Sequence, residues 1–290
     1  MIEKVLVVLV GLLVSLGAEE LPLSAELRKE FDLAEFYQQA IVVEGFPIVA
    51  SEKVAPVAMR EAEWVIRGML GERKDILRAL AKSKTRYSVM AVEERTSDVP
   101  EHSDLGPSIW WDRRARGLGA TPQRPSVSCG EENLLCCAGD PYSSENITVH
   151  EFAHAVHEMG LAIVDPTFDK RLGKTFRRAM AEGKWKGKYA ATNRQEYWAE
   201  AVQSWFETNR EDDHDHNHVN TRKELVEYDP AVAKLCEEVF GKENPWVYVR
   251  SDDPSRIGKG HLKGLDREKL PVFAWTEEEK KEAGKKREGK

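Results

Sequence analysis

Residues His150, Glu151 and His154 have the types and the spacing of a zinc-binding helix. Positions i and i+4 lie one turn apart on the same helical face, so the imidazoles of His150 and His154 can reach one metal ion. Glu151 lies beside them, where its carboxylate can accept a proton from a metal-activated water. The pattern predicts two zinc ligands and the general base that acts with them.

A second predicted helix, which begins near residue 193, offers carboxylates for a third ligand. Zinc in a hydrolase uses three protein ligands and leaves one position open for water. Glu196 falls in the first turn of this helix, where the helix dipole keeps a carboxylate ionised. We therefore predict one zinc ion per chain, bound by His150, His154 and Glu196. Glu200, one turn later on the same face, is predicted to accept a hydrogen bond from a ligand histidine.

The predicted reaction is hydrolysis of a peptide bond by zinc-activated water. Zinc lowers the pKa of water to about 7, so hydroxide is available at neutral pH. Glu151 would act as general base, and Tyr189, in the segment that enters the second helix, is the best-placed donor to the developing oxyanion. Asn193 is predicted to lie behind the ligands. His157 is predicted to lie behind them or to pack in the interior, with a third helical metal ligand as the alternative. The metzincin pattern would need Gly at 157 and His at 160, and the chain has the reverse.

Two segments of the chain carry a family resemblance. The sequence HEFAH at 150–154, followed by YAATNRQEYWAE at 189–200, resembles the catalytic domain of lethal-factor-type zinc metallopeptidases, which are gluzincin-like enzymes. The match covers residues 148–206. Residues 130–135 and 139–142 also resemble secreted proteins of the same peptidase-like group.

The resemblance has implications for individual residues. It implies that Glu196, rather than Glu200, is the third zinc ligand, and that Tyr189 assists the transition state. The targeting domains of the toxin have no counterpart in the sequence, so its host substrates are not implied.

Two other functions are open for such a scaffold. The first is a secreted protein that binds zinc without turnover, which the presence of Glu151 and Tyr189 beside a complete ligand set disfavours. The second is an enzyme whose substrate is not a peptide.

His214, His216 and His218 form a His-rich tract that either binds a metal weakly or belongs to a flexible polar loop near the cleft.

The composition is that of a globular protein, with 290 residues of which 41% are apolar and 32% charged. The net charge of −7 argues against nucleic acid or an anionic membrane as main partner.

An apolar run at 5–14 follows Lys4 and precedes small residues, which predicts a signal peptide at 1–18 and a secreted protein. The run is shorter than the roughly 20 residues of a membrane span, so we expect no stable membrane insertion. An uncleaved anchor is the alternative, and the oligomeric state is not predicted.

Four cysteines fit an exported protein, in which disulfides persist. Cys129 is expected to pair with Cys136 or Cys137, and Cys236 with the remaining thiol, although the connectivity cannot be read from the sequence. A zinc site built from cysteine and histidine is the alternative. It is disfavoured because the Cys136-Cys137 doublet lacks the usual gap of two to four residues.

The predicted fold class is α+β and zincin-like, with a small N-terminal sheet, an active-site helix and a helical C-terminal part. After the leader we predict an N-terminal α/β part at 19–100, a catalytic region at 101–250 and a charged tail at 251–290. The last residues of the tail, 277–290, are expected to be solvated and frayed.

Apolar periodicity and turn residues place the individual elements. Helices are predicted at 25–40, 54–70, 75–81, 146–159 and 168–180, a strand pair turning at Gly45 at 41–50, and a loop at 100–125. A strand at 87–92 is expected to edge the cleft and to pair with an extended substrate. Asn146 is expected to cap its helix rather than carry a glycan, and Thr192 to cap the helix of Glu196.

Overall fold

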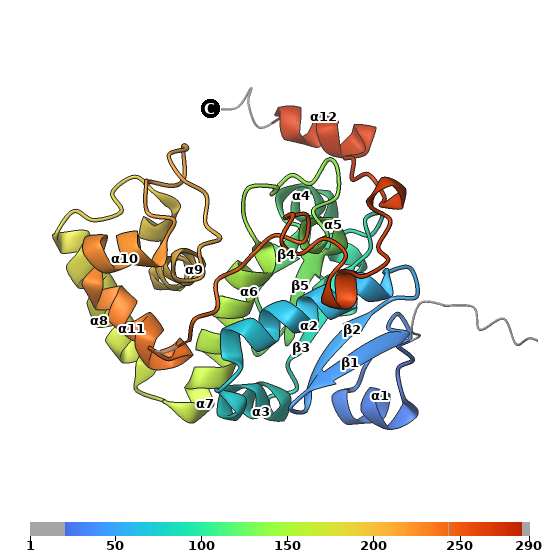
Figure 1. Cartoon of the computed structure of the whole chain (residues 1–290), viewed down its shortest axis with the longest axis horizontal. Coiled ribbons are helices and arrows are strands. Elements are labelled where there is room, and N and C mark those ends of the chain that lie inside the picture. Colours follow the sequence, from blue (N-terminus) through green and yellow to red (C-terminus); the bar gives the residue numbers. More distant parts are fainter. Residues whose placement is uncertain (1–20, 243, 286–290) are drawn as a thin grey trace, which may run out of the picture.

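The computed structural model describes residues 21–242 and 244–285 of the chain. The leader predicted at 1–18 lies outside these residues. In the described part, a small sheet and a group of C-terminal helices lie on either side of the helix that carries His150 and His154 (Figure 1). The predicted α+β fold class, with its small sheet, active-site helix and helical C-terminal part, is confirmed.

The sheet has five strands in the order β1-β2-β3-β5-β4. Their bounds are β1 Gln39–Val43, β2 Phe46–Ala50, β3 Arg86–Met90, β4 Gly117–Leu118 and β5 Ser126–Gly130. β1 and β2 form the predicted antiparallel hairpin, in which Glu44 and Gly45 both have positive φ, 51° and 87°. β2, β3 and β5 run parallel, and β4 pairs antiparallel with β5 at the edge of the sheet.

The strand predicted at the edge of the cleft is instead central. β3 lies between β2 and β5, and all five of its residues are buried. Both faces of such a strand are covered, so its two polar side chains need partners in the interior. Arg86 pairs with Glu101 at 3.0 Å, and the hydroxyl of Ser88 lies 2.7 Å from that of Ser126. The edge position belongs to β4, which lies inside the segment 100–125 that was predicted to be a loop. The same segment also contains a short helix, α4 Ser108–Arg114.

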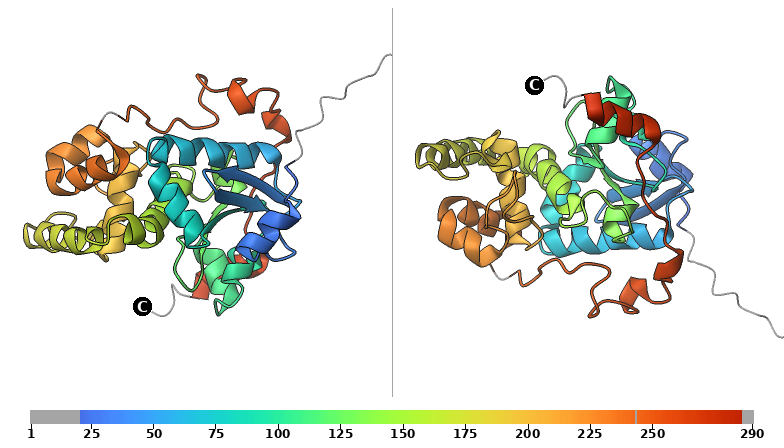
Figure 2. Two further views of the ribbon diagram at one scale, coloured as in Figure 1. Left: turned by 90° about the horizontal axis from the view of Figure 1, so that it is seen from below. Right: turned by 90° about the horizontal axis from the view of Figure 1, so that it is seen from above.

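Helices cover the sheet and build the C-terminal part (Figure 2). In the first half of the chain these are α1 Ala25–Phe31, α2 Pro56–Leu70, α3 Lys74–Lys82 and α5 Glu131–Leu134. The active-site helix is α6 Ile147–Ala155, continued by a π-helical segment Val156–Leu161 and by α7 Ala162–Val164. The C-terminal part contains α8 Phe168–Ala181, α9 Arg194–Trp205, α10 Arg222–Tyr228 and α11 Pro230–Phe240.

The predicted helix at 25–40 is shorter than expected. α1 ends at Phe31 because Asp32 adopts the left-handed conformation, with φ of 51°, and its backbone N–H bonds to the carbonyl of Arg28. The chain then turns and enters β1 at Gln39.

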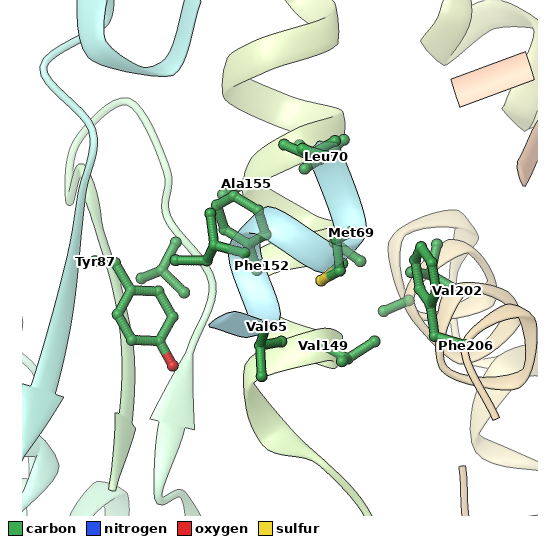
Figure 3. Packing of buried hydrophobic residues seen from close by; sticks show 14 of the residues in the cluster. Val65, Met69, Leu70, Tyr87, Val149, Phe152, Ala155, Val202 and Phe206 are labelled. Atoms are coloured by element: carbon green, nitrogen blue, oxygen red, sulfur yellow. The ribbon is translucent and has the colours of Figure 1, made fainter. Parts of the chain in front are cut away.

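One hydrophobic core joins the sheet, the active-site helix and the C-terminal helices (Figure 3). Met69 of α2 and Phe152 of α6 have no exposed surface, and neither has Phe206 at the end of α9. The apolar residues of α2 recur at intervals of three and four, which gives a helix one continuous buried face. Because α6 is packed between these layers, its position relative to α9 is fixed by the core.

The C-terminal segment, residues 245–285, packs along the body of the protein, in contrast to the predicted frayed terminus. Arg256 forms two bonds of 2.7 Å to the carboxylate of Glu61, which is completely buried in α2. The backbone N–H of Phe273 bonds to the carbonyl of Ala138 at 2.9 Å. The last described helix, α12 Glu277–Lys285, packs on α4 (Figure 1). An unpaired buried charge is costly, so the pairing of Arg256 with Glu61 holds this part of the charged tail on the body of the protein.

All four cysteines are free, so the predicted disulfides are wrong for this structure. Cys129 is buried in β5 and Cys236 in α11, and neither is bonded to the Cys136-Cys137 doublet. The sulfur of Cys136 instead lies 3.4 Å from the hydroxyl of Ser251. Burial raises the pKa of Cys129 and Cys137 to about 12, so both remain unreactive thiols at neutral pH.

Among the described residues, no helix has the length and the apolar character needed to cross a membrane.

Candidate metal centre and active-site cleft

The helix α6 is positioned by its cap and by its buried face. The side-chain oxygen of Asn146 accepts a hydrogen bond of 3.0 Å from the backbone N–H of Val149, which confirms the predicted cap. Val149, Phe152 and Ala153 are fully buried on the core side of the helix. The side chains of His150 and His154 therefore lie on a neighbouring face, directed toward α9.

The helix α9 begins at a different cap from the one predicted. Asn193, not Thr192, accepts hydrogen bonds from the backbone N–H groups of Gln195 and Glu196, at 2.8 and 2.9 Å. Thr192 has helical backbone angles and closes the preceding 3-10 turn Tyr189–Ala191, whereas Asn193 is extended as an N-cap residue must be. Asn193 thus fixes the first turn of α9, from which Glu196 projects.

His150, His154 and Glu196 come together at the crossing of α6 and α9. The two histidine Nε2 atoms are 3.2 Å apart, and Oε2 of Glu196 lies 3.1 Å from His150 Nε2 and 3.5 Å from His154 Nε2. Trp198 of α9 donates a hydrogen bond of 3.0 Å to the carbonyl of Ala153, which holds the two helices together. Among the described residues this is the one cluster of metal-ligating side chains whose ligand atoms lie within 4.8 Å of one another.

The triangle of donor atoms fits a tetrahedral zinc ion. Zinc bonds of about 2.0–2.1 Å to nitrogen and oxygen, at tetrahedral angles, place neighbouring ligand atoms about 3.3 Å apart. The three observed separations, 3.1, 3.2 and 3.5 Å, bracket this value. Two imidazole nitrogens and one carboxylate oxygen are also the donor set of catalytic zinc sites. The residues present therefore fit the predicted metal.

The ionisable groups of the triangle shift one another's pKa values. Burial alone would raise the pKa of Glu196, but hydrogen bonds from His150 and His154 hold it well below its usual range. Burial alone would lower the pKa of His150, whereas the neighbouring carboxylates, Glu196 foremost, raise it well above its usual value. The carboxylate is thus ionised, as zinc ligation requires, whereas zinc would have to displace a proton from His150, because only a neutral imidazole binds a metal.

The outer nitrogen of His150 has a partner that the sequence did not single out. Its Nδ1 lies 2.7 Å from Oε1 of Gln203, while the nearest oxygen of Glu200, the predicted acceptor, is 3.6 Å away. Gln203 in turn donates a hydrogen bond of 3.1 Å to Glu145. Its position seven residues after Glu196, on the same helical face, is the only signal for it in the sequence. Gln203 fixes the orientation of the imidazole from behind.

Replacing Gln203 with methionine is expected to weaken zinc binding by roughly 10- to 100-fold, because the acceptor is lost while the side-chain length is kept. Competition with a chromogenic zinc chelator measures the change. Gln195→Met is the matched control, since Gln195 lies on the same helix but bonds to Glu158 instead of a histidine. Equal affinities of Gln203→Met and the unmodified protein would exclude this role for Gln203.

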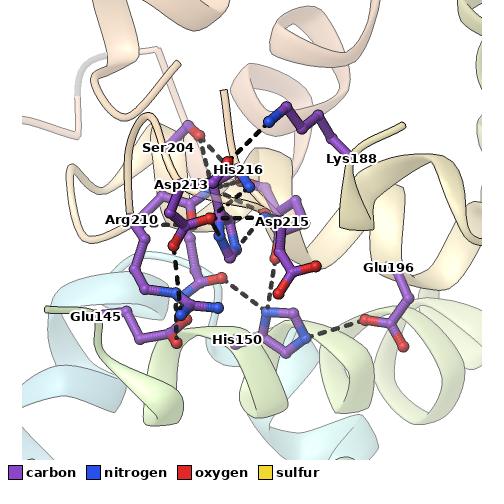
Figure 4. A network of polar contacts seen from close by, with 12 residues as sticks. Glu145, His150, Lys188, Glu196, Ser204, Arg210, Asp213, Asp215 and His216 are labelled. Atoms are coloured by element: carbon purple, nitrogen blue, oxygen red, sulfur yellow. Dashed lines mark hydrogen bonds and ion pairs between the residues drawn. The ribbon is translucent and has the colours of Figure 1, made fainter. Parts of the chain in front are cut away.

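Glu200 connects the centre to the His-rich tract. One of its oxygens lies 3.4 Å from Nε2 of His216 and accepts a hydrogen bond of 3.0 Å from Asn209. The other ring nitrogen of His216 lies 2.8 Å from Oδ1 of Asp213 (Figure 4). His216 is buried, whereas His214 is exposed and bonds to Asp215, and the ring of His218 packs on Tyr228. The three imidazoles therefore have separate partners. The tract forms a loop that lines the cleft through Asp215 and His216.

His157 lies against α8. Its Nε2 is 3.0 Å from Oδ1 of Asp169, its ring contacts the ring of Phe168 edge-on, and it is 3% exposed. Burial lowers its pKa, so the ring is neutral at physiological pH. In this position His157 links the active-site helix to the C-terminal helices.

Glu151 and Tyr189 both line the same cleft as the triangle, which has a volume of about 540 Å³. The ring of Tyr189 stacks on that of His150 with 6.3 Å between centroids. Its backbone N–H bonds to the carbonyl of Asp215 at 2.8 Å, which fixes the turn that carries it. Burial raises the pKa of Glu151, an effect opposed by His150 and His154.

Two glycines allow β4 to lie directly against α6. A Cβ atom on Gly117 would lie 2.5 Å from Ile147 and 2.6 Å from the carbonyl of Ser128, and a Cβ atom on Gly119 would lie 2.7 Å from the Cβ of His154. Any side chain here would force the strand and the helix apart. The residues 117–121 therefore form part of the cleft wall beside the predicted zinc ligands.

Substituting Gly119 by alanine is expected to lower kcat/KM for peptides by about 100-fold, because a misplacement of about 1 Å in a reacting site has such an effect. Steady-state kinetics on the zinc-loaded protein measure it. Gly173→Ala is the control, since a methyl group there meets only atoms 3.5 Å or more away. Unchanged kinetics of Gly119→Ala would show that the segment 117–121 does not position the substrate.

Comparisons with known proteins show what this chain is similar to. No family model matches this sequence, and no curated protein matches it. Among solved structures, the chain is similar to the PRO-PRO endopeptidase PPEP-2 from Paenibacillus alvei, with 15% identity and a TM-score of 0.47, over 67% of this chain and 97% of that one. A similarity this low establishes no shared activity. The resemblance to lethal-factor-type enzymes stays a prediction.

Proposed function

We propose that this chain is a secreted zinc metallopeptidase that hydrolyses a peptide or protein substrate. The proposal depends above all on the triangle of His150, His154 and Glu196, whose dimensions and donor types suit one zinc ion. The lethal-factor-type sequence resemblance supports the same ligand set. Export is supported by the apolar run at 5–14.

The roles of the side chains follow from their places in the cleft. When bound, zinc would supply Lewis acidity and would lower the pKa of a water in its open position to about 7. Glu151 accepts a proton from the attacking water and later donates it to the leaving amine. Such transfers contribute typically about 10²- to 10⁴-fold to the rate.

Tyr189 serves as the hydrogen-bond donor to the oxyanion. Burial, followed by the negative charges of Glu196 and Glu151, raises the pKa of Tyr189 far above its usual value. Its hydroxyl therefore stays protonated at neutral pH and can donate to the charge that develops on the scissile carbonyl. The stacking on His150 and the bond to Asp215 restrict its movement.

The edge strand favours a peptide over other substrates. β4 pairs with β5 on one side and faces the cleft on the other, and residues 117–121 line that cleft. An open strand edge offers backbone donors and acceptors that an extended peptide can pair with. A protein that only binds zinc is the alternative, and the presence of Glu151 and Tyr189 in the same cleft favours turnover over it.

Incubation of the purified protein with a diverse peptide library tests the proposal. New N-termini should appear, should be lost with 1,10-phenanthroline and should return when zinc is added back. Bound zinc without any cleavage would support the silent zinc-binding protein instead. Cleavage that resists the chelator would contradict the metal-dependent mechanism.

A further inference from the structure

We propose that Arg114 makes this cleft select a carboxylate group on the C-terminal side of the scissile bond. This proposal deepens the peptidase function above and depends on it. Arg114 is the last residue of α4, is exposed, and lines the cleft that contains the zinc ligands. Its guanidinium lies over the ring of Trp110, 5.0 Å from the centroid.

Three arginines line the cleft, and among the described residues Arg114 is the one of them without a carboxylate partner. The two other arginines of the wall are already paired. Arg116 bonds to Glu132 at 2.6 Å with both side chains fully buried, and Arg210 lies 3.1 Å from Glu145. A ligand in the cleft is therefore the partner left for its positive charge.

The opposite end of the cleft carries a negative charge. Glu158 lies one turn beyond His154 and is half-buried, and one of its oxygens accepts a hydrogen bond of 3.2 Å from Gln195. It has no cationic partner among the residues that the structure describes. A carboxylate on the substrate is thus attracted at the Arg114 end and repelled at the Glu158 end.

The contacts of β4 with α6 give the order of the two ends. Gly117 faces Ile147 and Glu151, and Gly119 faces His154, so residues 117–119 run in the same direction as α6. Arg114 precedes this strand, and Glu158 follows His154 on the helix. The Arg114 end and the Glu158 end therefore lie on opposite sides of the zinc ligands.

The polarity of the substrate follows from strand pairing. An antiparallel partner is slightly more stable per residue than a parallel one, so we take the bound peptide to run antiparallel to β4. Its N-terminal part then lies at the Glu158 end and its C-terminal part at the Arg114 end. The carboxylate that Arg114 attracts therefore lies on the C-terminal side of the cleaved bond. It is either an Asp or Glu side chain or the C-terminus of the peptide itself.

The cleavage of matched peptides by the zinc-loaded protein tests this preference for a carboxylate. The first set carries Glu or Gln at one of the three positions after the cleaved bond, with an amidated C-terminus. The second set ends at those positions with a free or an amidated C-terminus. The third carries Glu or Gln before the cleaved bond. We expect kcat/KM to be threefold to tenfold higher for a carboxylate after the bond and lower for a carboxylate before it, with both ratios shrinking as salt rises.

Variants assign the effect to Arg114. In Arg114→Gln, kcat/KM should be about equal for the peptides with Glu and with Gln after the cleaved bond. Arg114→Glu should cleave a peptide with Lys at that position faster than one with Gln. Arg177→Gln, on the surface of α8, should keep the original ratio. Cleavage of all peptides at equal rates by the unmodified protein would overturn this inference alone. A lack of cleavage of any peptide by the zinc-loaded protein would overturn the proposed function with it.

Discussion

Glu151→Gln is expected to retain one zinc ion per chain and to lose about 10²- to 10⁴-fold in peptide turnover. Glutamine has nearly the same shape as glutamate but cannot accept the proton of the attacking water. Glu151 lies on the cleft wall and is not a member of the ligand triangle, so metal binding should persist. Metal content and kcat are measured on the same preparation.

The control for this change is Glu158→Gln, the same substitution two turns later along the helix, assayed on a peptide without charged side chains. Its kcat should stay within a few-fold of the original value. Glu151→Gln at full turnover would show that another group takes the proton. Loss of zinc together with activity would place Glu151 among the ligands instead.

Glu196→Ala is expected to lose most of its zinc, whereas Glu200→Ala should keep most of it. The oxygen of Glu196 lies 3.1 and 3.5 Å from the two histidine Nε2 atoms, within the triangle that fits zinc. The nearest approach of Glu200 is to the outer nitrogen of His150, at 3.6 Å. Removing one of three ligands costs far more affinity than removing a group behind them.

Dialysis of both variants against the same zinc buffer, followed by metal analysis, measures the difference. Circular dichroism spectra of both variants check that they remain folded, a necessary control because Glu200 is almost fully buried and bonds to Asn209. Equal zinc losses in the two variants would contradict the ligand assignment.

Local patterns in the sequence were enough to predict the elements that carry the ligands. The helix of His150 and His154 has a buried face at regular spacing, and its cap at Asn146 is a residue type that favours that position. The hairpin of β1 and β2 was visible from Gly45 between two apolar runs. Periodicity and turn chemistry are properties of neighbouring residues, so they can be read without the fold.

Features that depend on contacts between distant residues could not be predicted. β4 has two residues, one of them glycine, and shows no alternating pattern, so only its pairing with β5 reveals it. Whether Glu200 or Gln203 reaches His150 depends on how α6 and α9 cross. The tail is ordered by pairs such as Arg256 with Glu61, which are 195 residues apart. Cysteine pairing likewise requires positions in space that a sequence does not contain.

The central claim is that His150, His154 and Glu196 close around one zinc ion. The most direct test is a crystal structure of the zinc-loaded protein with anomalous diffraction measured on both sides of the zinc absorption edge. We expect one zinc peak per chain at about 2.0–2.2 Å from the Nε2 atoms of His150 and His154 and from an oxygen of Glu196. A zinc peak held instead by His214, His216 or His218, with none at the triangle, would contradict it.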